Sequence, residues 1–137
     1  MTSATQEILQ PANWPRPKGF SHGIAARGRL LFLAGQVGWD SSGRFASDRL
    51  AEQVKVALEN IVAVLAEAGA RPEHVTRMVL YVTSREEYYA ALKDIGANYR
   101  AVMGRHFPAM SVVQVVALME PEAKVEIEAT GVVPEAD

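Results

Sequence analysis

The feature that most restricts the fold of this chain is a regular series of apolar side chains between residues 50 and 68. They recur at intervals of three and four, at Leu50, Val54, Leu58, Ile61, Leu65 and Ala68. This interval places them along one side of an α-helix, so the segment is predicted to be a long helix that covers a core. Ser47 or Asp48 is expected to cap its start, and Gly69 to end it.

Apolar runs on both sides of this helix predict strands. Val75–Val82 is β-branched and of strand length, and Ser111–Leu118 is a second extended segment. Residues 125–133 are predicted to be the last strand, because Val125, Ile127 and Ala129 alternate with Glu126, Glu128 and Thr130, as on a strand with one buried face. Gly23–Ala26 and Leu30–Ala34, joined by a glycine-containing turn, are predicted to pair as a β-hairpin.

A second long helix is expected after Ser84, which has the spacing of a capping box with Glu87. Its apolar side is formed by Tyr88, Leu92, Ile95, Tyr99 and Val102. Residues 1–18 include several prolines and are predicted to be an irregular lead-in. These elements predict an α+β fold with one mixed β-sheet and both helices on one face. The other face would then be uncovered, which favours an oligomer.

The composition argues against several classes of protein. The chain has 137 residues, which suits a single domain over residues 1–137, and its net charge of −2 gives no basic excess for nucleic acid. It contains no cysteine, so disulfides and thiolate nucleophiles are excluded. No apolar run is long enough to span a membrane and no leader pattern is present, so we expect a cytoplasmic protein. His74 and His106 lack ligand spacing, so no metal is expected.

Five short motifs occur in an order that resembles one known family. They are Gly35-Gln36-Val37, Gln53 followed by Leu58-Glu59-Asn60-Ile61, Ala68-Gly69-Ala70, Pro108-Ala109-x-Ser111 and Val125-Glu126-Ile127-Glu128-Ala129. Each is weak alone, but together they extend over about residues 19–133. On these motifs the chain resembles the Rid family, also known as YjgF/YER057c/UK114 or endoribonuclease L-PSP.

The resemblance implies a chorismate-mutase-like fold and a homotrimer with ligand clefts between subunits. Active members hydrolyse 2-imino or 2-enamino acids to 2-keto acids and ammonia, without a metal or an organic cofactor. In those members an arginine after Pro-Ala pairs with the substrate carboxylate, and a planar guanidinium suits that task. A glutamate in the last strand positions or activates the attacking water.

This chain keeps only part of that site. Glu126 matches the glutamate and is the expected catalytic residue, while the Gly35 backbone N–H remains a candidate donor to the ligand. Met110 occupies the arginine position, so a carboxylate loses its main anchor. Three other residues are expected near the ligand: Phe20, which replaces the family's pocket tyrosine, the helical Tyr99, and His22. The family's helical asparagine is replaced by Gly96.

Three functions remain open from the sequence. The first is hydrolytic deamination, or a related hydrolysis, of a small imine or enamine, with the usual 2-imino acid activity weak or absent. The second is a non-catalytic trimer that binds a small ligand. The third is ribonuclease activity, which the acidic balance of the chain opposes. Some relatives without the arginine form separate subgroups, one of which deaminates 2-aminomuconate, but no residue assigns this chain to it.

Overall fold

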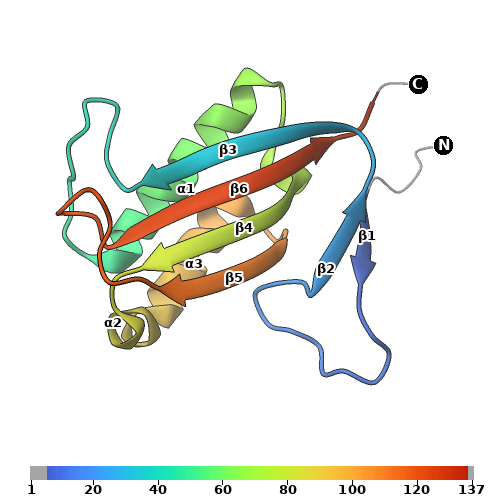
Figure 1. Cartoon of the computed structure of the whole chain (residues 1–137), viewed down its shortest axis with the longest axis horizontal. Coiled ribbons are helices and arrows are strands. Elements are labelled where there is room, and N and C mark those ends of the chain that lie inside the picture. The colour runs from blue at the N-terminus through green and yellow to red at the C-terminus, as the bar shows by residue number, and fades with distance from the viewer. Residues whose placement is uncertain (1–5, 136–137) are drawn as a thin grey trace.

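The computed structural model of this chain describes residues 6–135 and shows an α+β fold in which helices cover one face of a β-sheet (Figure 1). The strands are β1 (Gln6–Leu9), β2 (Gly23–Ala26), β3 (Arg29–Val37), β4 (Val75–Val82), β5 (Ala109–Gln114) and β6 (Val125–Val133). The helices are α1 (Leu50–Glu67), the short 3₁₀ turn η1 (Pro72–His74), α2 (Arg85–Ala90) and α3 (Leu92–Met103). The predicted long helix, the strand at residues 75–82 and the last strand are confirmed.

The main sheet has four strands in the order β3-β6-β4-β5. The β4–β5 pair is parallel and the other pairs are antiparallel, so the sheet is mixed as predicted. Helices α1 and α3 lie together behind it (Figure 1). The core between the layers is formed by fully buried side chains such as Leu58, Ile61, Leu65, Met78 and Ile127. Their burial removes the predicted apolar stripe from water and stabilises the fold.

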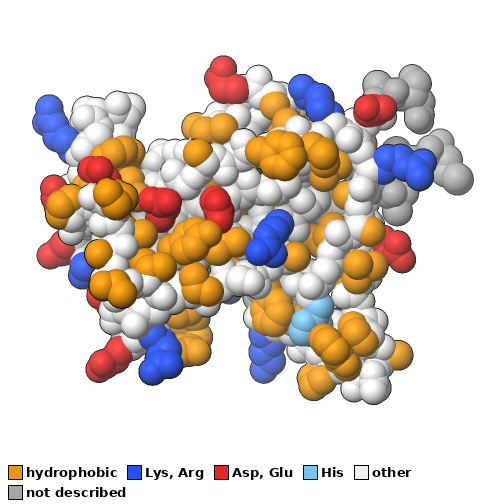
Figure 2. Space-filling model, in the orientation of Figure 1, with side chains coloured by type: hydrophobic (Ala, Val, Ile, Leu, Met, Phe, Trp, Pro, Cys, Tyr) orange, Lys and Arg blue, Asp and Glu red, His pale blue; other side chains and the backbone are white. Residues whose placement is uncertain are grey.

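The two faces of the sheet differ because side chains alternate along each strand. In β6, Val125, Ile127 and Ala129 are buried towards the helices, whereas Glu126 and Glu128 are on the outer face. No helix among the described residues covers this outer face (Figure 1). Figure 2 shows hydrophobic side chains spread across it between acidic and basic ones.

Two predictions for the first forty residues are wrong. Residues 6–9 are not irregular but form β1, while residues 10–18 contain no helix or strand, and residues 1–5 lie outside the described part. The predicted hairpin does not form, because β2 pairs with β1 and β3 pairs with β6. Both strands exist, but the chain turns at Gly28 from one sheet into the other (Figure 1).

Several predicted boundaries also need correction. Helix α1 begins after Arg49, and neither Ser47 nor Asp48 caps it, although the Ser47 hydroxyl accepts a bond from the Arg49 N–H. Ser84 does cap α2, but the Glu87 carboxylate bonds to Lys124 instead of completing a capping box. The second helix is divided in two at Ala91. The predicted strand at residues 111–118 runs from 109 to 114.

Candidate functional site

The sheet separates the predicted site residues into two groups. Met110 in β5 lies beside Met78 of β4, which is fully buried on the helix-covered face. Glu126 in β6 lies beside Tyr81, on the outer face. Within one chain the structure therefore does not bring Met110 and Glu126 together.

The outer group consists of Glu126 and Gly35. The pairing of β3 with β6 shifts register between Leu33 and Gln36, so that Gly35 lies against the Glu126 side chain. A Cβ added at Gly35 would come within 2.8 Å of the Glu126 Cγ and even closer to its carboxylate. Glycine at this position is therefore what lets the Glu126 carboxylate lie over the strand.

The two outer glutamates of β6 have different environments. The Tyr81 hydroxyl donates to the Glu128 carboxylate, and this bond, followed by burial, raises the pKa of Tyr81. No hydrogen bond or ion pair of the described residues engages the Glu126 carboxylate, which is partly exposed. Glu128 is thus occupied by a neighbouring strand, while Glu126 is available to a water molecule or a ligand.

The inner group lines a cavity of about 490 Å³ between the sheet edge, α1 and α3. Phe20, Tyr99 and Met110 all contribute to its wall, so three of the predicted ligand-binding residues do share one site. The Tyr99 hydroxyl donates to the His106 carbonyl oxygen at 2.6 Å, and its ring stacks on Phe107. Burial raises the pKa of Tyr99, so the phenol stays protonated and only its ring is free to contact a ligand.

The loop around Phe20 is held in place by Ser21. The Ser21 side chain is buried, and its hydroxyl donates to the Phe107 carbonyl oxygen at 2.6 Å. The Ser21 N–H also bonds to the Pro108 carbonyl oxygen at 3.0 Å, which fixes the loop against the start of β5. His22 is exposed and packs between the rings of Trp14 and Phe20. It supports the Phe20 ring from outside the cavity and is not part of the cavity wall.

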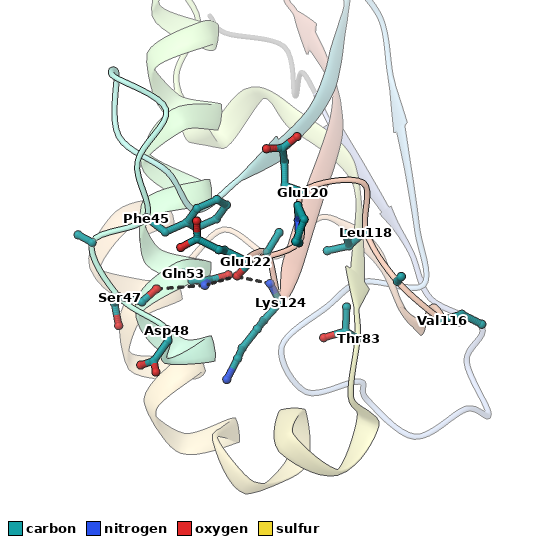
Figure 3. Close-up of a pocket in the computed structure, with 14 residues that line it drawn as sticks. Phe45, Ser47, Asp48, Gln53, Thr83, Val116, Leu118, Glu120, Glu122 and Lys124 are labelled. Carbon is teal, nitrogen blue, oxygen red and sulfur yellow. Dashed lines mark hydrogen bonds between the residues drawn. The ribbon is translucent and has the colours of Figure 1, made fainter.

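A larger hollow of about 780 Å³, which the sequence did not indicate, lies at the other end of the sheet. Figure 3 shows it between the loop that carries Phe45 and Ser47 and the segment from Val116 to Lys124. Three carboxylates line it, those of Asp48, Glu120 and Glu122. Their side chains are at the rim of a polar network that is centred on a buried glutamine.

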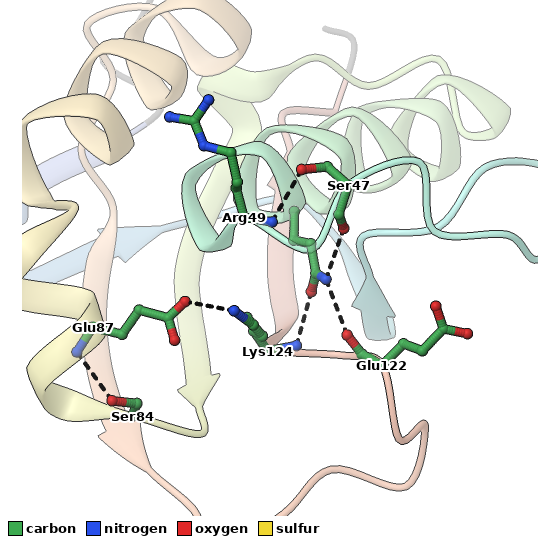
Figure 4. A network of polar contacts seen from close by, with 7 residues as sticks. Ser47, Arg49, Ser84, Glu87, Glu122 and Lys124 are labelled. Carbon is green, nitrogen blue, oxygen red and sulfur yellow. Dashed lines mark hydrogen bonds and ion pairs between the residues drawn. The ribbon is translucent and has the colours of Figure 1, made fainter.

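That glutamine is Gln53, which is only 1% exposed. Its Nε2 donates to the carbonyl oxygens of Ser47 and Glu122 at 3.0 Å, and its Oε1 accepts from the Lys124 N–H at 2.8 Å (Figure 3). The Lys124 ammonium in turn pairs with Glu87 at 2.8 Å (Figure 4). Gln53 therefore joins the start of α1 to the residues that lead into β6, two positions before Glu126.

We expect Gln53→Leu to destabilise the protein strongly. Leucine has a similar volume but leaves two carbonyl groups and one N–H without their partner, and each buried unpaired polar group costs about 1–3 kcal/mol. The free energy of unfolding in urea should fall by about 3 kcal/mol or more. Gln10→Leu is the control, because its exposed amide makes only bonds of 3.2–3.4 Å. Equal stability of the two variants would show that the Gln53 network is not important.

Asn60, in the same helix motif, has a structural role. Its Nδ2 donates to the carbonyl oxygens of Val37 at 3.0 Å and Trp39 at 2.9 Å, so it holds the chain just after β3. Gly38 lets the chain after β3 lie close to helix α1, because an added Cβ would come within 2.7 Å of the Gln53 Cα. The motif residues of α1 are therefore positioning residues for both strands that carry the outer group.

The described residues include no group of three or more His, Asp or Glu side chains that could hold a metal ion. None of the helices in that part of the chain is both long enough and apolar enough to cross a membrane.

Comparison with known proteins gives a consistent set of relatives. The family described as endoribonuclease L-PSP matches residues 13–133. A RutC family protein of Synechocystis sp. is 32% identical, over 95% of this chain and 98% of its own length. The human 2-iminobutanoate/2-iminopropanoate deaminase is 27% identical, over 96% and 93%.

Solved structures agree with these sequence matches. YyfB of the conserved Rid protein family, from Yersinia pestis, has a TM-score of 0.82 and 35% identity, and the match covers 95% of this chain and all of that one. A member of the YjgF/YER057c/UK114 family from Mycobacterium tuberculosis has a TM-score of 0.63 and 32% identity, over 84% and 87%.

Proposed function

This chain belongs to the endoribonuclease L-PSP family, which is the Rid or YjgF family, and we propose that it hydrolyses a small imine or enamine. In this reaction water adds to the C=N carbon, the C–N bond then breaks, and a carbonyl product and ammonia are released. The reaction is a hydrolysis and needs no oxidant or reductant. Support comes from the family match over residues 13–133 and from relatives that are named deaminases.

The observation that carries the proposal is the unengaged carboxylate of Glu126. It lies over Gly35, while its neighbour Glu128 is occupied by the Tyr81 hydroxyl. A positioned carboxylate of this kind can take a proton from the attacking water and return it to the leaving nitrogen. The backbone N–H of Gly35, at the edge of the same group, is a candidate donor to the substrate.

We further propose that the active form is a homotrimer with the site between subunits. Glu126 and the cavity that contains Met110 lie on opposite faces of one sheet, so only a second chain can bring the two groups together. The outer face also exposes large apolar side chains, with Leu30 at 58%, Phe32 at 78% and Val113 at 42% exposure. An exposed apolar area of this kind favours association.

The usual 2-imino acids should be poor substrates. Met110 has no charge, and a charge-assisted pair contributes about 1.5–3 kcal/mol, so a small carboxylate is held weakly. A panel of 2-aminoacrylate, iminoleucine and 2-aminomuconate, assayed by ammonia release, tests the proposed chemistry directly. If the protein hydrolyses neither these compounds nor other imines, a non-catalytic ligand-binding trimer is favoured. The apolar cavity wall formed by Phe20 and Met110 supports that alternative.

Met110→Arg should increase the affinity for small carboxylates. Met110 is partly exposed at the cavity wall, so a guanidinium there can remain hydrated while it pairs with a carboxylate. Calorimetry with pyruvate should give a dissociation constant about tenfold lower than for the parent. Met119→Arg is the matched control, because Met119 is 92% exposed and lies outside this cavity. Unchanged pyruvate affinity in a folded Met110→Arg protein would place the ligand elsewhere.

A further inference from the structure

We propose that Arg100 supplies the carboxylate-binding cation of this chain, and that the ligand is a carboxylate with a large apolar or aromatic body. This inference rests on the proposed function, because it names the substrate class of the cavity that contains Met110. Arg100 is in α3 and lines the same cavity as Met110, Phe20 and Tyr99. The cation would therefore come from helix α3, while Met110 lines the cavity from β5.

The Arg100 guanidinium lies beside Gly96. Arg100 follows Gly96 by one helical turn, and helical side chains lean towards the N-terminus of their helix. The Arg100 Nη1 lies 3.4 Å from where a Cβ at Gly96 would be. Gly96 itself lines the cavity, so the guanidinium rests on the cavity wall. A larger residue at position 96 would occupy this space.

The charges around the cavity favour an anion. Of its fifteen lining residues only Lys18 and Arg100 are charged, and both are cations. The ion pairs found among the described residues involve neither of them. Both residues are exposed, so they are accessible to an incoming ligand. A carboxylate can pair with the planar guanidinium through two parallel hydrogen bonds.

The rest of the wall favours an apolar body. It includes the rings of Phe20, Tyr88, Tyr99 and Phe107 together with the flexible side chain of Met110. The volume of about 490 Å³ is far more than a three-carbon acid fills, and it is typical of sites for larger organic ligands. Met110 thus makes one side of the wall apolar, while Arg100 provides charge on the other.

Tyr88 offers one further polar group to the ligand. Tyr88 lines the cavity and burial raises its pKa, so its phenol is a neutral donor at physiological pH. Phe20 has no hydroxyl, and the Tyr99 hydroxyl is bonded to His106. Tyr88 is therefore the phenol of this cavity that can donate to the ligand.

The test uses three probes with the intact protein: 3-phenylpropanoate, its uncharged analogue 3-phenylpropanol, and propanoate, which lacks the ring. Calorimetry at low salt should show that 3-phenylpropanoate binds about tenfold or more tightly than either of the others. Arg100→Gln should weaken 3-phenylpropanoate about tenfold and leave 3-phenylpropanol unchanged. Arg105→Gln removes the same charge from an exposed position outside the cavity and should leave all three affinities within about twofold of the parent.

Each other outcome overturns the inference. Equal affinities for 3-phenylpropanoate and 3-phenylpropanol would show that charge does not contribute to binding. Equal affinities for 3-phenylpropanoate and propanoate would show that the apolar body does not contribute. Unchanged affinity in Arg100→Gln, with circular dichroism showing a folded protein, would exclude this arginine. Because these measurements need no turnover, they stay separate from the proposed function: unchanged 3-phenylpropanoate affinity in an Arg100→Gln protein that still hydrolyses an imine would reject the inference and keep the function.

Discussion

Replacing Glu126 by glutamine should lower kcat by about a hundredfold or more on whichever imine the protein hydrolyses. Glutamine keeps the size of the side chain and its acceptor oxygen, but it cannot take a proton from water. Steady-state rates of ammonia release at saturating substrate measure this effect. Since the parent carboxylate has no partner among the described residues, the substitution should leave the unfolding midpoint nearly unchanged.

Glu128→Gln is the matched control for that experiment. It makes the same change two residues along β6, and glutamine can still accept the bond from the Tyr81 hydroxyl. We expect less than about a threefold change in kcat, as for a substitution that touches no reacting group. An equal loss of kcat in the two variants would show that activity depends on the total charge of the outer face. Glu126 would then not act as a specific base.

Gly35→Ala provides a second, independent test of the same carboxylate. The three atoms nearest to a new Cβ all belong to the Glu126 side chain, so the carboxylate must move away while the strand can keep its fold. The substitution changes no charge. A fall in kcat without a fall in stability would therefore show that the position of the carboxylate over Gly35 is needed, and full activity would show that it is not.

The sequence predicted those parts of the fold that have long and regular patterns. The three- and four-residue spacing of α1 continues over eighteen residues, and apolar and polar side chains alternate in β6 from Val125 to Thr130, so both patterns are long enough to predict the element. Strand β1 has only four residues, too few to show a period. The failed hairpin has a different cause. The glycine-containing turn led to the prediction that β2 pairs with β3. In the structure, β3 pairs instead with β6, about a hundred residues later in the chain.

The site could be predicted only one residue at a time. Family motifs indicated Glu126, Met110 and Phe20, but they carry no information on which sheet face each side chain occupies in this chain. That depends on strand register, which places Met110 beside the buried Met78. Arg100 was missed because its position in the cavity depends on a helix packing against the sheet edge. Its spacing of four from Gly96 was the available signal.

The assembly gives the second large expected effect. Phe32→Glu should convert the proposed trimer to monomers, as measured by light scattering against a chain mass of 14.9 kDa. Phe32 is 78% exposed on the outer face, and burying such a side chain contributes about 1.5–3 kcal/mol at each interface. A carboxylate there would lose this contribution and add an unpaired charge to a face that already holds Glu126 and Glu128. Because a closed ring has three equal contacts, the loss is repeated three times.

Tyr89→Glu is the control, since it adds the same charge at an aromatic residue that is 65% exposed on α2, away from the outer face. It should remain a trimer. The Phe32→Glu monomer should also lose imine hydrolysis, because Glu126 would no longer meet the cavity of a second chain, while 3-phenylpropanoate should still bind to a cavity formed within one chain. A Phe32→Glu protein that stays trimeric would show that another surface makes the contact. An active monomer would show that one chain contains the whole active site. The cavity that contains Met110, on the opposite face of the sheet from Glu126, would then not be needed for hydrolysis.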